Sequence, residues 1–220
     1  MEKYFYIIEW AYNFSVVTLI IPVIAAFFKW NFLNFSLKLA AVQAIRILIV
    51  GLLSLYYANI EHSQRLLYHV SPCLDIILVS LLIATIFDFK NQFKWSLALL
   101  CITFIVLVIN DYLTTKALIS SYLSTAETIF VIIASILMLR KVVLTYRSST
   151  YKRSLIWILS ALLISNLCGI LIPILMEKIS AYSTDLMQLS WYLFYSLFNV
   201  ITNLMVAYGF YIIRNKVREA

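Results

Sequence analysis

Asp75 is the residue whose type and position point most directly to chemistry. It lies eight positions into an apolar run from Leu67 to Phe87. An ionised carboxylate at the centre of a bilayer costs about 2.5–3.5 kcal/mol on insertion scales, so it requires a cationic partner, a water-filled cavity or a bound proton. Asp75 is therefore a candidate binding residue. We predict that it pairs with Arg46, which lies inside the preceding apolar run.

Other polar residues share helix faces or depths with this pair. Side chains three or four positions apart lie on one face of a helix, and Tyr195 and Asn199 follow this spacing in the last apolar run. Glu9, Asp75 and Glu127 all lie about 8–14 Å below one membrane surface, at 1.5 Å per residue. The candidate ligand-binding residues are Glu9, Arg46, Asp75, Glu127, Asn166, Tyr195 and Asn199.

We predict that these side chains meet in an outward-opening polar cavity, acidic at its mouth and closed at its floor by the Arg46–Asp75 pair. Three alternatives stay open. An Arg–Asp pair can simply hold two helices together. The shallow carboxylates, Glu9 and Glu127, can reach the headgroups. Asparagine and serine side chains inside a membrane commonly form hydrogen bonds between helices and have no further role.

The elements that must position these residues are apolar stretches long enough to cross a bilayer. The 220-residue chain is 64% hydrophobic and 12% charged, a composition of membrane bundles. About 20 helical residues cross the hydrocarbon core. We predict an all-α fold, a single seven-helix transmembrane domain over residues 1–220, with continuous helices kinked only near Pro22 and Pro173. The spans run approximately from Tyr4 to Phe28, Leu37 to Ala58, Leu67 to Phe87, Trp95 to Asn110, Leu118 to Leu139, Ser154 to Met176 and Leu186 to Ile213.

The distribution of Lys and Arg predicts the orientation of these spans. Of the 17 basic residues, 12 fall on one side of the membrane if the N-terminus is outside, four fall on the other, and Arg46 lies within a span. Basic residues accumulate on the cytoplasmic side, so we predict an N-out, C-in topology. The net charge of +7 is thus explained without nucleic acid, because the basic residues are spread over four inner segments.

Residues that several enzymes and pigments require are missing from the chain. Every Lys lies at or beyond a span end, which excludes a buried retinal Schiff base. His62 and His69 are the two histidines, too few for a three-His zinc site. Cys73, Cys101 and Cys168 stand singly in apolar runs, as core residues do. Without HExxH or DDxxD motifs, we predict no catalytic residue, no metal, no cofactor and no enzymatic activity.

Two stretches carry a resemblance to known proteins. They are LLYHVSPCLDIILVSLLI, from Leu66 to Ile83, and WYLFYSLFNVITNLMVAYGFYI, from Trp191 to Ile212. Both resemble segments of small, functionally uncharacterised bacterial seven-helix integral membrane proteins, in which an acidic residue follows a His in the third helix and Asn residues recur in the last. The resemblance covers about 40 residues. It implies a multi-pass protein of the bacterial inner membrane and no particular activity.

The predicted cavity favours a sensory or ligand-binding membrane module that binds a small molecule and acts through a partner. The alternative is a small-solute transporter of 3+1+3 helix arrangement, similar to SWEET and PQ-loop proteins, because the fourth span is nearly free of polar residues. A structural or assembly subunit is the third option, and an enzyme acting through the carboxylates the last. The expected partners are the lipid bilayer, a small-molecule ligand and a signalling or membrane protein, but not nucleic acid.

Overall fold

The computed structural model describes the backbone of residues 2–59, 65–88, 91–114, 117–145, 149–180 and 185–213, and almost all of this backbone is helical. Side chains are described for residues 6–57, 70–88, 94–95, 97–109, 125–145, 149–171 and 193–213. Within these ranges the elements are α1 (Glu2–Val17), α2 (Ile20–Lys29), the 3-10 helix η1 (Trp30–Phe32), α3 (Phe35–Asn59), α4 (Arg65–Phe87), α5 (Asn91–Thr114), α6 (Ala117–Thr145), α7 (Thr150–Ser180) and α8 (Asp185–Tyr211).

Six helical segments of the described chain are long and apolar enough to cross a membrane. The first combines α1, α2 and η1, and the other five belong to α3, α4, α6, α7 and α8. Large apolar side chains such as Phe27, Phe28 and Trp95 are exposed, as expected of a surface that faces lipid. The fourth predicted span lies in α5, whose described apolar stretch, Leu97–Ile109, is shorter than the others.

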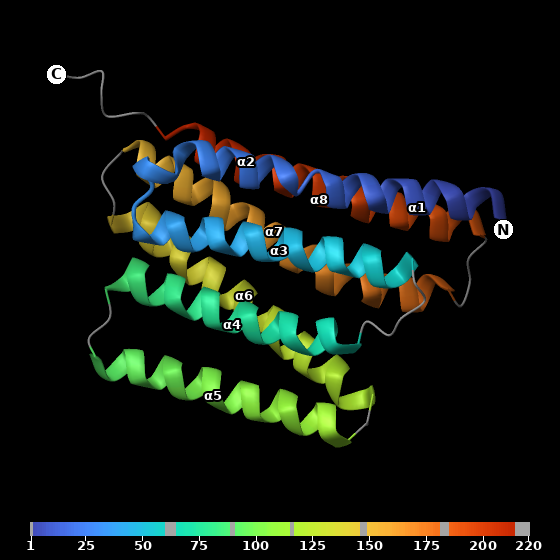
Figure 1. Ribbon diagram of the computed structural model, residues 1–220, viewed down its shortest axis with the longest axis horizontal. Helices are drawn as coiled ribbons and strands as arrows, with labels where there is room; N and C mark the ends of the chain where they lie inside the picture. The colour runs from blue at the N-terminus through green and yellow to red at the C-terminus, as the bar shows by residue number, and fades with distance from the viewer. Residues whose placement is uncertain are drawn as a thin grey trace.

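The six long segments close into a ring. Contacts between neighbours lead from α1 and α2 to α3, then α4, α6, α7 and α8, which packs back against α1 and α2. Helix α5 lies outside this ring, against α4 and α6, at one edge of the molecule (Figure 1). We call the two ends of the ring the N-terminal end, where α1 begins, and the basic end, where α2 and α8 finish (Figure 1).

The basic end of the ring is filled by an apolar core. Every ring segment contributes to it, and Leu37, Met138, Leu155 and Phe210 are almost completely buried there. These residues lie near the start of α3 and α7 or in the second half of α6 and α8, all toward the basic end. The packing leaves polar residues of the ring in the remaining part of the bundle.

The first span is interrupted just before Pro22, where the sequence predicted a kink in a continuous helix. Helix α1 ends at Val17 and α2 begins at Ile20. Pro22 has no N–H to donate to the carbonyl of Thr18, and the N–H of Ile21 donates to that carbonyl instead, at 3.1 Å. The break is therefore the local consequence of Pro22, whereas α7 continues as a helix through Pro173.

Replacing Gly209 by valine is expected to destabilise the bundle. A Cβ at Gly209 would lie 2.7 Å from Cγ1 of Ile158 and 3.1 Å from the carbonyl oxygen of Ser154, and such overpacking costs about 1–3 kcal/mol. Gly169→Val is the matched control, because a Cβ there meets no neighbouring atom within 4 Å. Thermal unfolding in detergent measures both variants. Equal melting temperatures would contradict the close approach of α7 and α8.

Candidate functional site

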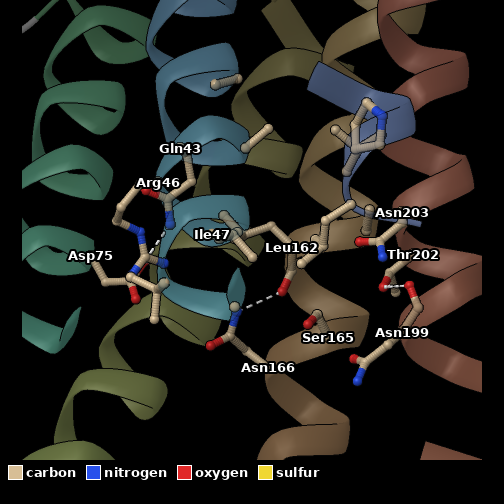
Figure 2. A pocket seen from close by; sticks show the side chains of 18 of the residues that line it. Gln43, Arg46, Ile47, Asp75, Leu162, Ser165, Asn166, Asn199, Thr202 and Asn203 are labelled. Carbon is tan, nitrogen blue, oxygen red and sulfur yellow. Dashed lines mark hydrogen bonds and ion pairs between the residues drawn. The ribbon is translucent and has the colours of Figure 1, made fainter. Parts of the chain in front are cut away.

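A cavity of about 440 Å³ lies inside the ring and is lined by residues from all six of its segments. The lining combines apolar side chains, such as Ile47 and Leu162, with charged and amide side chains. Figure 2 shows Arg46 and Asp75 on one side of this cavity and Asn199 on the other. A mixed lining of this kind is typical of small-molecule sites.

The predicted ion pair between Arg46 and Asp75 is present. Nη2 of Arg46 lies 2.5 Å from Oδ1 of Asp75, and Nε2 of Gln43 donates to the same oxygen. Nη1 of Arg46 donates to Oγ of Ser71 at 2.6 Å. Gln43 and Arg46 are one turn apart on α3, as Ser71 and Asp75 are on α4, so the two antiparallel helices present matching polar faces. The polar group of four residues is thus built from a spacing of three positions on α3 and a spacing of four positions on α4.

The pair lies in the wall of the cavity and not at its floor, which corrects the sequence-based prediction. Beyond Arg46 and Asp75 the lining continues toward the basic end through Leu39, Leu82 and Ile158. The reason is that the helices carrying the pair are direct neighbours in the ring, so the two charges meet between α3 and α4 and do not span the cavity. The floor is apolar.

Glu127 brings a second carboxylate into the cavity. It lines the cavity and is only 8% exposed, so it does not extend to the headgroups. Oγ1 of Thr128 lies 3.4 Å from its Oε2. Among the described residues that line the cavity, one cation therefore faces two carboxylates.

An amide group on α8 forms the opposite wall. Nδ2 of Asn203 donates to Oγ1 of Thr18 at 2.9 Å and to the carbonyl of Ser15 at 3.3 Å. Asn203 thereby binds α8 to the interruption between α1 and α2, where backbone groups lack regular helical partners. Asn199 lies one turn away and lines the cavity beside it (Figure 2).

Six of the seven predicted site residues line this one cavity: Arg46, Asp75, Glu127, Asn166, Tyr195 and Asn199. Glu9 does not line it and is exposed on α1, so the described residues give the cavity no acidic mouth. The sequence predicted the depth of Glu9 in the membrane. Whether its side chain points into the ring or out of it depends on how α1 packs against its neighbours. The amide of Asn166 is partly engaged within its own helix, since its Nδ2 donates to the carbonyl of Leu162 at 2.8 Å.

The site prediction missed Gln43, Ser15, Thr18 and Asn203. The spacing of three between Gln43 and Arg46, and of four between Asn199 and Asn203, was a signal for two of them. Ser15 and Thr18 gain their role from the break before Pro22, where the sequence predicted a kink but did not reveal that Asn203 would contact it. In the described part of the chain, no three His, Cys, Asp or Glu side chains come close enough together to hold a metal ion.

Removing one member of the ion pair is expected to cost more stability than removing both. Arg46→Met leaves the Asp75 carboxylate buried without its counter-charge, and Asp75→Leu leaves the guanidinium, each at a cost of about 3–5 kcal/mol. The Arg46→Met/Asp75→Leu double variant removes both charges. Denaturation of the four proteins in a double-mutant cycle measures the coupling, and strictly additive losses would argue against a direct pair.

Comparison of this chain with protein-family models, with curated proteins and with solved structures finds no match.

Proposed function

We propose that this protein is a sensory or ligand-binding membrane module with seven spans, oriented N-out and C-in, that binds a small solute in the cavity of the ring. One observation carries the proposal. A single cavity collects Arg46, Asp75, Glu127 and Asn199 from four helices. Ionisable residues inside a membrane are costly and mark functional sites by default.

The asymmetry of the ring supports binding from one side. The apolar core fills the basic end, which the distribution of Lys and Arg assigns to the cytoplasm. The cavity therefore opens toward the N-terminal, extracytoplasmic end in our proposal. Its volume of about 440 Å³ suits a small ligand. A bound ligand would change the packing of helices that meet at the cavity, and a partner protein would receive this change.

Transport is the second candidate, and two observations favour it. Helix α5 lies outside the ring, so that α1–α4 and α6–α8 form two groups joined by a peripheral helix, as a 3+1+3 arrangement requires. The first span is also interrupted beside the cavity, at Thr18 and Leu19. Interrupted helices at mid-membrane depth surround the solute sites of many transporters.

A panel of small organic cations, zwitterions, anions and neutral sugars tests ligand binding. We expect at least one class to raise the melting temperature of the protein in nanodiscs, since a ligand at 100 times its Kd stabilises by about 2.7 kcal/mol. Glu127→Gln is expected to reduce this shift, because Glu127 lines the cavity. Glu9→Gln makes the same chemical change on the exposed part of α1 and should preserve it. A panel without any shift would refute the proposal.

Uptake of the ligand into proteoliposomes distinguishes transport from sensing. If the protein transports, labelled ligand should accumulate inside, and Asp75→Asn should abolish uptake because it removes the charge that fixes Arg46. Glu9→Gln again serves as the control. Tight binding without any flux would instead favour the sensory module.

A further inference from the structure

We infer that the ligand of this cavity is a small organic monocation, an ammonium ion held beside Glu127. The inference rests on the proposed function and adds the chemical class of the ligand. It comes from three observations on the described residues, which are the balance of charge in the cavity, the two tyrosines in its lining, and the mixed character of the walls.

The charge balance leaves Glu127 without a counter-ion of its own. Both terminal nitrogens of Arg46 are engaged by Asp75 and Ser71, so the single described cation of the lining is already paired. Glu127 is 8% exposed, and the adjacent Thr128 donates a long hydrogen bond to it, at 3.4 Å. A buried carboxylate takes up a proton unless a positive charge lies beside it, and an ammonium ligand would supply that charge and allow Glu127 to ionise.

No comparable argument supports an anion. Nε of Arg46 has no hydrogen-bond partner, but this atom is fully buried and cannot reach a ligand. Oε1 of Gln43 is likewise buried without a donor. The wall with the Arg46–Asp75 pair is close to neutral, so the net negative charge of the described lining depends on Glu127.

Two aromatic rings line the cavity together with the carboxylates. Tyr12 on α1 and Tyr195 on α8 are both part of its lining, as Asp75 and Glu127 are. Tyrosine faces attract organic cations, above all ammonium groups.

The walls suit an organic ion better than a bare metal ion. A metal ion requires several oxygen ligands at short range, whereas the described part of the chain holds no cluster of three acidic, His or Cys side chains. The cavity of about 440 Å³ also has apolar walls, with Ile47, Val50 and Leu162 among them. Alkyl groups of an ammonium ion can contact these walls while its charge faces Glu127.

Choline and 3,3-dimethyl-1-butanol, its uncharged carbon isostere, provide the test. The full-length protein in nanodiscs is titrated with both, and binding is followed by calorimetry. We expect choline to bind at least about tenfold more tightly than the isostere, and Glu127→Gln to weaken choline binding by at least about tenfold. Glu9→Gln should leave choline affinity unchanged. Tyr195→Leu should weaken it and Tyr195→Phe should not, because the ring face and not the hydroxyl meets the cation.

The outcomes distinguish failure of the cation inference from failure of the proposed ligand-binding function. Equal binding of choline and its isostere, or choline binding that survives Glu127→Gln, overturns the cation inference. Absence of choline binding overturns it too. In these cases the proposed function still stands if another member of the panel binds in the cavity. If no cation, zwitterion, anion or sugar binds, both proposals fail. Melting temperatures of the variants without ligand show that each is folded.

Discussion

The ion pair between Arg46 and Asp75 is the interaction on which the polar half of this bundle depends. Two charges inside a low-dielectric bundle are tolerable only if they neutralise each other and find further hydrogen bonds, and Gln43 and Ser71 supply these. The pair joins α3 to α4 by a charged contact between their facing polar residues. It also sets the charge of the cavity, since it leaves Glu127 as the carboxylate without a separate cation.

The ring separates two kinds of packing along its axis. Toward the basic end, side chains such as Met138 and Phe210 interdigitate without exposure and close the bundle. Nearer the middle, the break before Pro22 and the polar side chains of α3, α4, α7 and α8 prevent equally dense apolar packing, and a cavity remains. Asn203 satisfies groups at the break, so the interruption is stabilised from across the ring.

This division bears on how ligand binding could be transmitted. The cavity lies among helices that are joined by polar contacts, whereas the basic end is a buried apolar core. Polar contacts such as that of Asn203 with Thr18 have alternative partners once a ligand enters, while a close-packed core changes only between discrete arrangements. A sensor and a transporter would both use this property, and they differ in whether the apolar floor ever opens.

The sequence by itself determined the helical class and the positions of the six long apolar segments, and it singled out Arg46 and Asp75 as buried charges, because hydropathy and the cost of a charge in lipid are local properties of the chain. It also indicated the Arg46–Asp75 pair, since their neighbouring helices needed a counter-charge. The tertiary structure decided which faces meet. Only the ring placed Glu127 inside and Glu9 outside, put the pair in the wall of the cavity, and assigned Asn203 to the break at Thr18. Glu9 and Glu127 have the same residue type and the same predicted depth, so the sequence alone could not distinguish them. The rotation of each helix about its axis is set by packing with its neighbours.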